Sequence, residues 1–517
     1  GTPIYDFDTE YQLDKQLVEM ISCVMVNATI KQLYEPLKNV VIVANSPVKD
    51  GVAIPTEAEL VGALKAAVAA DVEPFKDNVV KEPLISDESA LKGSKVVKSV
   101  KDESLGFTEW TLANGIKVVI KQTPYQADNI GVEAISDGGA AVFANDMYYS
   151  AQMLGGVMSM SGISKFSASD LRKQLSGKTA SAGLGVSSYE HVVTASAALK
   201  DVETMFQLLY LQFTAPRFSE DDFTTLMNRY NSMLANQTSN PDFIFSQNVQ
   251  KSLYSDNYRR QQLTPELLQT IKLEHMPAIH KRLYSNAADF RFTFIGNMSE
   301  EQLKPYVEKY IGSLPTAQKP GNVYTDDNVD YAKGGVVNDF RTKMEQPKVS
   351  VFFAYTGDMA VTMKNKLVAT YLTTALDNRY LKSIREEKGG TYGVGVSAAL
   401  IPRTKQYALQ VQFDTNEQMA DELMAIVVAE LEKIAKEGPL KEDMDKTREY
   451  ENKNYTKSIE QNSWWSNAIL YKYRYGIDYV KEYLDAVNSV TAADVKALAQ
   501  QILKDGNLVK VVMRPEK

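Results

Sequence analysis

The chain has little of the chemistry on which many metalloproteins and disulfide-rich proteins depend. Among its 517 residues there is one cysteine, Cys23, and three histidines, His191, His275 and His280. A single cysteine excludes an internal disulfide and a thiolate metal cluster. Zinc motifs such as H-x-x-E-H need two histidines four residues apart on one helix face, and no pair here has that spacing. We therefore expect no metal site in this chain.

Long apolar runs and a strong basic charge are also absent. No stretch of about eighteen apolar residues occurs, so the sequence predicts no membrane span. The formal net charge is -8, which argues against a general nucleic-acid binder because neutralising phosphates requires a basic face. With 44% hydrophobic and 24% charged residues, the composition is that of an ordinary globular protein.

The most informative segment is the one in which a helix passes into a strand through Gly389 and Gly390. Apolar residues recur before it every three to five positions and predict an amphipathic helix: Leu367, Tyr371, Leu372, Leu376, Tyr380, Leu381 and Ile384. Beyond the glycines, alternation from Thr391 to Ala399 predicts a strand with one face nearly bare of side chains. The corner would hold two hydrogen-bond donors, Arg385 and Tyr392, where a peptide could approach. A purely structural role for both is the alternative.

A helix followed by a short apolar strand occurs three times, in residues 27–45, 273–297 and 492–513. The second copy closes a domain-sized unit that opens with a hairpin at residues 110–120, where Asn-Gly signals a two-residue turn. Few residues precede the first copy. We therefore expect residues 1–52 to be the tail of a preceding domain, with a small N-terminal subdomain as the alternative.

The remaining segments predict two further domains and two linkers. Residues 53–105 contain one amphipathic helix and a polar, proline-containing stretch typical of an interdomain linker, and residues 319–334 form a second linker. Residues 106–318 and 335–517 each mix hairpin-like strands with long helices. This pattern predicts an α+β fold in which mainly antiparallel sheets are covered by helices.

Two other motifs are weaker candidates for a site. Trp464 and Trp465 lie on a predicted helix beside polar residues, so they could line a substrate surface, although core packing is the commoner reason for such residues. Residues 176–179 resemble the end of a phosphate-binding loop. The first glycine of that loop is missing, however, and a strand rather than a helix follows.

The segment from Arg385 to Val394, in which Tyr392 follows Arg385 by seven positions, resembles the Arg/Tyr signature of the pitrilysin (insulinase-like) zinc metallopeptidases. Residues 108–118 resemble the domain-opening hairpin of that family, and residues 462–465 resemble its late helix. In this family, four homologous α/β domains close around a peptide. The first domain supplies H-x-x-E-H, and the fourth supplies the Arg/Tyr pair.

The resemblance implies a role for each part of the chain. Residues 1–52 become the end of the second domain, residues 106–318 a catalytically silent third domain, and residues 335–517 the fourth. Tyr392 is then expected to stabilise the developing oxyanion, and Arg385 to hold a substrate carbonyl or to orient Tyr392.

The resemblance also implies what lies outside this chain. Zinc and H-x-x-E-H are expected in an N-terminal half, in the same chain or in a separate subunit, so this chain alone would be inactive towards its peptide substrate. A bacterial periplasmic location follows family habit only. The other hypothesis is a non-catalytic binding or scaffolding subunit of the same fold.

Overall fold

The computed structural model describes residues 5–34, 40–46, 53–71, 73, 82–391 and 393–516. The chain divides into two compact units, Gly1–Asn78 and Val79–Lys517. The first unit contains α1 (Phe7–Met20), α2 (Cys23–Tyr34) and α3 (Glu57–Ala69). None of its described residues is buried. Thr56 and Glu59 form a reciprocal capping box that begins α3.

Residues 40–46 correct one expectation, because they form no strand although the sequence pattern of the first repeat predicts one. The physical reason is that a strand needs a neighbouring strand for its N–H and C=O groups. None of the described residues of the first unit is a strand. The apolar side chains Val41 and Val43 are accordingly 84% and 77% exposed.

The second unit contains a seven-stranded sheet in the order β1-β2-β3-β7-β4-β6-β5. Its strands are β1 (Val96–Asp102), β2 (Phe107–Leu112), β3 (Lys117–Gln122), β4 (Ile130–Asp137), β5 (Ala180–Val186), β6 (Glu190–Ala197) and β7 (Arg291–Gly296). The associated helices include α4 (Asn145–Ser161), α6 (Val202–Thr214), α7 (Glu220–Gln237), α8 (Pro241–Leu253), α10 (Met276–Tyr284) and α11 (Glu300–Lys309). The predicted Asn-Gly turn is confirmed between β2 and β3, where Gly115 has φ +89°.

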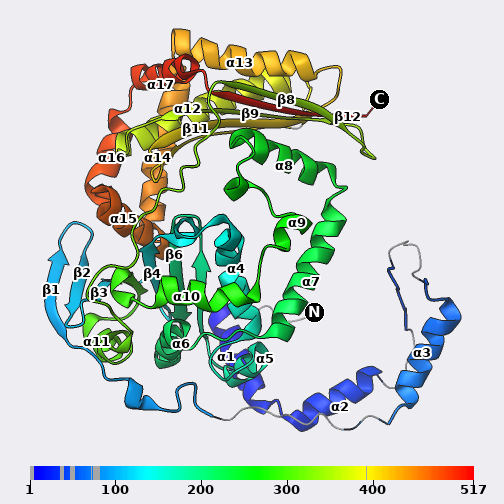
Figure 1. Cartoon of the computed structure of the whole chain (residues 1–517), viewed down its shortest axis with the longest axis vertical. Helices are drawn as coiled ribbons and strands as arrows, with labels where there is room; N and C mark the ends of the chain where they lie inside the picture. Colours follow the sequence, from blue (N-terminus) through cyan, green and yellow to red (C-terminus); the bar gives the residue numbers. More distant parts are fainter. Residues whose placement is uncertain are drawn as a thin grey trace. The chain divides into compact units, whose positions relative to one another are not determined.

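A five-stranded sheet follows in the order β10-β11-β9-β12-β8. Its strands are β8 (Gly335–Thr342), β9 (Val349–Asp358), β10 (Val394–Ile401), β11 (Gln406–Thr415) and β12 (Leu508–Pro515). Its helices are α12 (Met363–Tyr380), α13 (Ala420–Glu437), α14 (Lys441–Ser458), α15 (Asn462–Tyr475), α16 (Tyr479–Ser489) and α17 (Ala492–Asp505). Figure 1 shows α13 and α17 on one side of this sheet and α8 on the other.

The two sheets share one topology, so the internal repeat is structural as well as sequential. The order β3-β7-β4-β6-β5 of the first sheet recurs as β8-β12-β9-β11-β10 in the second. In the first sheet, β7 runs parallel to β3 and antiparallel to β4. In the second, β12 likewise runs parallel to β8 and antiparallel to β9. Antiparallel pairs predominate, which confirms the α+β class with helix-covered sheets.

Strand β1 lies inside residues 53–105, the range expected to be a linker. It pairs antiparallel with β2 along the edge of the first sheet, with a register shift between Val96 and Lys98. Side chains along β1 are mostly exposed, so the apolar periodicity that identifies a buried strand is missing from its sequence. The domain boundaries as a whole stay a prediction.

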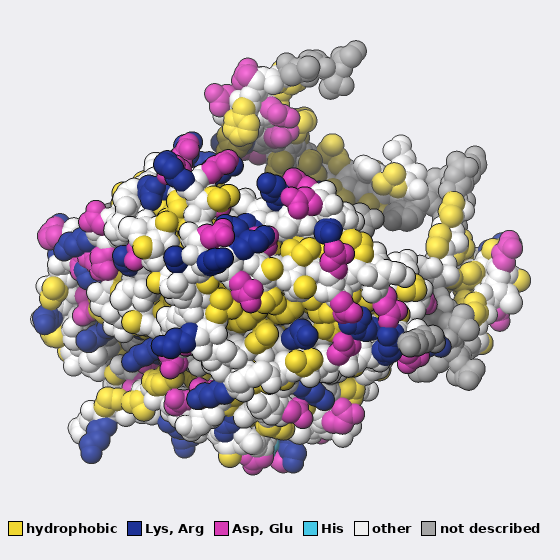
Figure 2. All heavy atoms as spheres, turned by 90° about the horizontal axis from the view of Figure 1, so that it is seen from above, with side chains coloured by type: hydrophobic (Ala, Val, Ile, Leu, Met, Phe, Trp, Pro, Cys, Tyr) yellow, Lys and Arg dark blue, Asp and Glu magenta, His cyan; other side chains and the backbone are white. Residues whose placement is uncertain are grey.

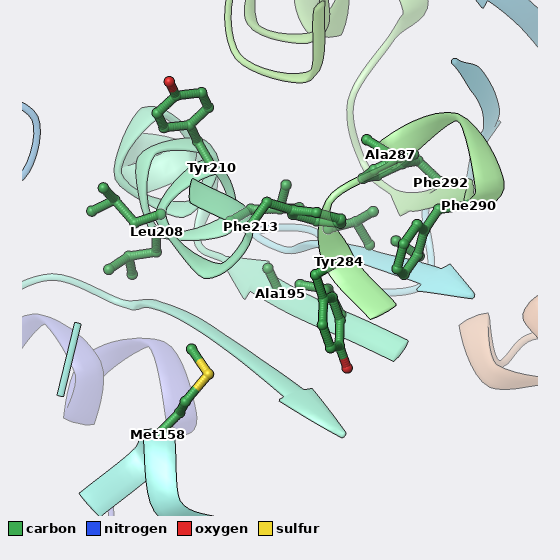
Figure 3. Close-up of a cluster of buried hydrophobic side chains, with 14 of the residues drawn as sticks. Met158, Ala195, Leu208, Tyr210, Phe213, Tyr284, Ala287, Phe290 and Phe292 are labelled. Atoms are coloured by element: carbon green, nitrogen blue, oxygen red, sulfur yellow. The ribbon is translucent and has the colours of Figure 1, made fainter. Parts of the chain in front are cut away.

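Aromatic packing fixes α10 and β7, the helix and strand of the second repeat copy, against the first sheet. Figure 3 shows Phe213 of α6 beside Tyr284, Phe290 and Phe292. The Phe213 ring centroid lies 5.0 Å from that of Phe290 and 5.8 Å from that of Phe292. Edge and tilted contacts of this kind add to the free energy of burying each ring, which is about 1.5–3 kcal/mol. They hold α10 and β7 in the middle of the domain.

Charge is distributed without a large block of one sign on the face drawn in Figure 2, where acidic and basic side chains are interspersed. The formal net charge of -8 is therefore not gathered into a single patch there. Among the helices of the described residues, none combines the length and hydrophobicity needed to cross a membrane.

Candidate functional site

The predicted Arg/Tyr corner begins where α12 loosens into a wider turn. Residues Leu381–Glu386 form a π-helix, in which the Glu387 amide donates to the Lys382 carbonyl at 3.0 Å. Such turns are rare and often occur at functional sites. The predicted apolar stripe is confirmed with one exception, because Leu381 is 40% exposed and the other members are buried. Arg385 lies in this wide turn and is exposed.

Gly389 closes the helix in the left-handed conformation, with φ +63°. Its amide donates to the Arg385 carbonyl at 3.1 Å, and the Gly390 amide donates to the Ile384 carbonyl at 3.4 Å. Ile384 is fully buried beneath the turn. Backbone hydrogen bonds therefore fix the turn that carries Arg385, while the Arg385 side chain is exposed.

Gly390 is needed for a different reason, which is the close approach of α13. A Cβ atom at this position would lie 2.7 Å from Cε of Met419 and 2.8 Å from Cδ1 of Leu423. The hydroxyl of Thr415 donates to the Gly390 carbonyl at 2.6 Å in a buried hydrogen bond. The corner is thus fixed between α13 and the end of β11.

The partner predicted for Arg385 lies outside the described residues, since Tyr392 is not among them. On either side of it, the Thr391 hydroxyl lies 3.0 Å from the Gly393 carbonyl and 3.2 Å from the Gly393 amide. Strand β10 consequently begins at Val394, later than the Thr391 start predicted, because a side chain takes up these backbone groups before the ladder begins. The Arg385 guanidinium forms no hydrogen bond or ion pair with any residue that the structure describes. The Arg385–Tyr392 pairing stays a prediction.

Beyond the corner, β10 is an edge strand with one sparsely covered face. Among the strands that the structure describes it pairs with β11 only, and Gly395, Ser397 and Ala399 are exposed on the face away from α12. At Ala398 the outer edge is partly occupied, since the amide of that residue donates to the Thr373 hydroxyl at 2.7 Å. The remaining edge has the geometry by which an extended peptide can add to a sheet.

The two candidate tryptophans lie at the beginning of α15, where this helix packs against the first sheet. Their ring centroids are 4.8 Å apart, and Trp465 donates from Nε1 to the Ile459 carbonyl at 2.8 Å. The Lys121 ammonium of β3 lies 3.8 Å from the Trp465 ring centroid, and burial lowers the pKa of Lys121. The structure places both tryptophans in packing contacts; a substrate-lining role for either stays a prediction.

The same interface contains a charged cluster that sequence reasoning did not find. Arg474 of α15 pairs with Glu190 at 2.6 Å, and Arg403, in the β10–β11 turn, pairs with Asp137. A cavity of about 490 Å³ lies beside these residues and is also lined by Tyr473. The arginines and the carboxylates are more than two hundred residues apart in the chain, so no local spacing indicates the cluster.

Each of the three histidine rings lies within hydrogen-bonding distance of another group of the protein. Nε2 of His191 lies 2.9 Å from the Leu283 carbonyl, and Nε2 of His280 lies 2.8 Å from the Gln212 carbonyl. Burial lowers the pKa of His191 to about 4. Nδ1 of the third histidine, at position 275, lies 3.0 Å from a serine hydroxyl. In the part of the chain that the structure describes, no group of three His, Cys, Asp or Glu side chains is arranged to hold a metal ion.

Comparison with known proteins relates this chain to the M16 peptidases. Residues 270–450 match the family described as "Peptidase M16 inactive domain". The resemblance to the pitrilysin-like zinc metallopeptidases is thereby confirmed.

Named relatives agree with this class. The chain is 22% identical over 438 residues to "Probable zinc protease PqqL" of Escherichia coli K12, covering 82% of this chain and 45% of that protein. It is 21% identical over 420 residues to "Zinc protease PQQL-like" of Arabidopsis thaliana, covering 78% of this chain and 41% of that one. The chain therefore spans less than half the length of the curated relatives it matches.

Solved structures show the same fold. The crystal structure of the periplasmic protease PqqL from Escherichia coli superposes with a TM-score of 0.74 at 18% identity, covering 89% of this chain and 51% of that one. The structure of only the first half of that protease superposes with a TM-score of 0.65 at 12% identity, covering 81% of this chain and 93% of that one. The fold of this chain is thus also the fold of the first half of PqqL.

Proposed function

We propose that this chain is the C-terminal half of an M16-type zinc endopeptidase that degrades peptides in a closed chamber. The observation that carries the proposal is the corner itself. Arg385 is exposed and unpaired among the described residues, on a backbone tied down by Gly389 and Gly390, beside an edge strand that can accept a peptide. An exposed arginine with a fixed backbone suits substrate binding better than it suits fold stability.

The proposed roles follow from donor chemistry. The Arg385 guanidinium, which carries five N–H donors, binds a substrate carbonyl or orients the Tyr392 side chain. The Tyr392 hydroxyl donates to the oxygen on which negative charge develops as water adds to the scissile peptide bond. A positioned donor of this kind contributes about 3 kcal/mol to transition-state stabilisation when water is excluded from the site.

Zinc does not fit the residues of this chain. The described histidines are engaged with backbone carbonyls or a serine hydroxyl, and no described carboxylates gather around them. A zinc protease built with this chain must take its metal site from another part of the protein. The sequence signature expected there is H-x-x-E-H.

The first unit supports the existence of such a part. Helix α2 and the exposed apolar residues 40–46 resemble, in order and composition, α10 with β7 and α17 with β12. In both of those copies the strand lies in the interior of a sheet. We propose that residues 1–52 end a preceding homologous domain, that residues 106–318 and 335–517 form the third and fourth domains, and that segments 53–105 and 319–334 join them.

The partner is then an N-terminal half carrying H-x-x-E-H, in the same chain or in a separate subunit. We propose a periplasmic location because the structural neighbour PqqL is described as a periplasmic protease. A non-catalytic scaffolding or binding subunit is the second candidate. It is favoured by the match of residues 270–450 to a domain described as inactive. An N-terminal half that lacks the zinc motif would favour this second candidate.

Steady-state kinetics of the complete protein test the proposal. Tyr392→Phe should lower kcat about a hundredfold with little change in the unfolding midpoint, and Arg385→Met should also lower kcat/KM. Arg229→Met is the matched control, since Arg229 is an exposed arginine of α7 that forms no hydrogen bond or ion pair with the described residues. Unchanged kinetics in both corner variants would refute the role. The 517-residue chain alone should show no chelator-sensitive peptide hydrolysis.

A further inference from the structure

Helix α8 lies against the face of the five-stranded sheet opposite α12, α13 and α17 (Figure 1). A cleft of about 450 Å³ remains between α8 and strands β9 and β11, and we call it the α8 cleft. We propose that the α8 cleft binds an extended polypeptide segment, one apolar side chain of which enters the cleft while its backbone bonds to the surrounding amides and hydroxyl. The identity of the ligand as a peptide rests on the proposed function.

The floor of the cleft is apolar and already buried. Phe245 and Val249 of α8 meet Phe352 of β9, and these side chains are 5%, 9% and 6% exposed. A groove of this composition accepts an aliphatic or aromatic side chain in preference to a charged one. The floor is therefore the part of the cleft that selects the side chain.

Unpaired polar groups surround that floor. The side chains of Gln250, Gln410 and Gln412 form no hydrogen bond with any residue in the described part of the chain. Ser350 lines the cleft and is only 1% exposed, and its Oγ atom has no hydrogen-bond partner among the described residues. A buried hydroxyl without a partner costs free energy, so its position indicates a ligand atom that completes the bond. A peptide backbone has both N–H donors and C=O acceptors, so it can form hydrogen bonds with the glutamine amides and the Ser350 hydroxyl of the cleft.

The charged groups at the cleft are paired with one another, one lysine with two aspartates, which leaves a formal excess of one negative charge. Nζ of Lys348 lies 2.8 Å from a carboxylate oxygen of Asp242 and 3.0 Å from one of Asp414, and the two bonds connect α8 to the sheet. No other cation lines the α8 cleft as described. A phosphate-rich ligand would find no free positive charge there, which favours a polypeptide over a nucleic acid.

The position of the cleft relates it to the corner. Gln412 pairs in register with Gly395, and Gln410 pairs with Ser397. Directly paired residues of antiparallel strands point to the same face of a sheet, so the two glutamines lie beside the sparsely covered face of β10. A peptide seated in the α8 cleft can continue across Gly395 towards the corner that holds Arg385. The cleft is thus an accessory subsite adjacent to the proposed site.

Binding of a probe peptide to the 517-residue chain tests the inference without requiring catalysis. The probe is a fluorescein-labelled extended peptide with one central leucine in a serine and threonine background, and fluorescence anisotropy reports its Kd. The double variant Gln410→Leu/Gln412→Leu should weaken binding by about fivefold or more, as expected when net hydrogen bonds are lost. Ser246→Trp, which fills the cleft from α8, should abolish binding. Gln418→Leu, at an exposed glutamine outside the cleft, should leave Kd unchanged.

Folding and location are checked by further measurements. Ser350→Ala removes a hydroxyl that has no partner, so it should keep the unfolding midpoint and still weaken binding by about threefold. A probe with benzoylphenylalanine at its centre should crosslink to α8 residues within 241–253. The inference is overturned if the cleft variants bind like the parent chain, if Gln418→Leu weakens binding equally, or if the crosslink lies elsewhere. Turnover of the Tyr392→Phe variant in the complete protein is independent of these outcomes, so the two proposals fail separately.

Discussion

Gly389 and Gly390 are neighbours, yet the structure predicts that replacing each with alanine destabilises the protein for a different reason and by a different amount. At Gly389 the obstacle is conformational, because φ is +63° while no atom lies within 4 Å of an added Cβ. A non-glycine residue in the left-handed region costs about 1–2 kcal/mol. The unfolded alanine chain also loses about 0.4–1 kcal/mol of conformational freedom, which offsets part of that cost. We expect Gly389→Ala to lower the free energy of unfolding by about 1 kcal/mol.

At Gly390 the obstacle is steric. An added Cβ would lie 2.7 Å from Cε of Met419 and 2.8 Å from Cδ1 of the fully buried Leu423. Overpacking of this kind costs about 1–3 kcal/mol, and moving the corner also strains the Thr415 hydrogen bond, worth about 1 kcal/mol. Cε of Met419 and Cδ1 of Leu423 are the ends of flexible side chains and can shift, and the same unfolded-chain effect of about 0.4–1 kcal/mol offsets part of the cost, so we expect a net loss of about 1–3 kcal/mol. The entropy effect on the unfolded chain is the same for both variants, so it cancels in their comparison.

Urea unfolding followed by tryptophan fluorescence measures both losses, because Trp464 and Trp465 lie on a helix of the same domain. Combining Gly390→Ala with Met419→Ala should recover part of the loss, since one of the two obstructing side chains is removed. Met419→Ala should not reduce the loss of stability caused by Gly389→Ala. A larger loss for Gly389→Ala than for Gly390→Ala, or no recovery in the double variant, would refute the assignment of strain and overlap to these positions.

Three further predictions concern the first sheet and its interface with α15. Because burial lowers the pKa of His191 from 6.5 to about 4, its contribution to stability is present above pH 6.5 and lost as pH falls towards 4. His191→Phe should reduce the dependence of the unfolding midpoint on pH between 6.5 and 4. An unchanged pH dependence would contradict this prediction. Tyr473→Phe removes a 2.5 Å hydrogen bond to Glu109 and should cost about 1–2 kcal/mol in urea unfolding, whereas an unaltered midpoint would show that this bond contributes nothing. Arg474→Met should cost about 1–2 kcal/mol, because Glu190 keeps a second partner; a loss insensitive to salt would argue against an electrostatic origin.

Local patterns were sufficient for elements with strong periodicity. The apolar repeat before residue 381 predicted α12, and the alternation from Thr391 to Ala399 predicted β10, which spans Val394–Ile401. Gly438 ends α13 with φ +87°, as a glycine at a helix end indicates. Strand β1 was missed because an exposed edge strand carries little apolar alternation.

The candidate site was predictable only in part. The seven-residue separation of Arg385 and Tyr392 is visible in the sequence, and so is the double glycine that turns the chain. The contact between Trp465 and Lys121 is not visible in the sequence, because the ammonium that lies over the Trp465 ring comes from a strand more than three hundred residues earlier. Contacts of this kind depend on how two domains pack, which no local periodicity records.

By itself, the sequence determined the helix–glycine–strand corner, the repeated helix and strand, and the absence of metal-binding spacing, because backbone preference and apolar periodicity act over a few residues. Only the tertiary structure decided that Gly390 approaches α13 closely, that Arg403 and Arg474 meet Asp137 and Glu190, and that α8 leaves a cleft over Ser350. These features arise where segments distant in the chain are brought together by burial of apolar surface, and that geometry exists only in the folded protein.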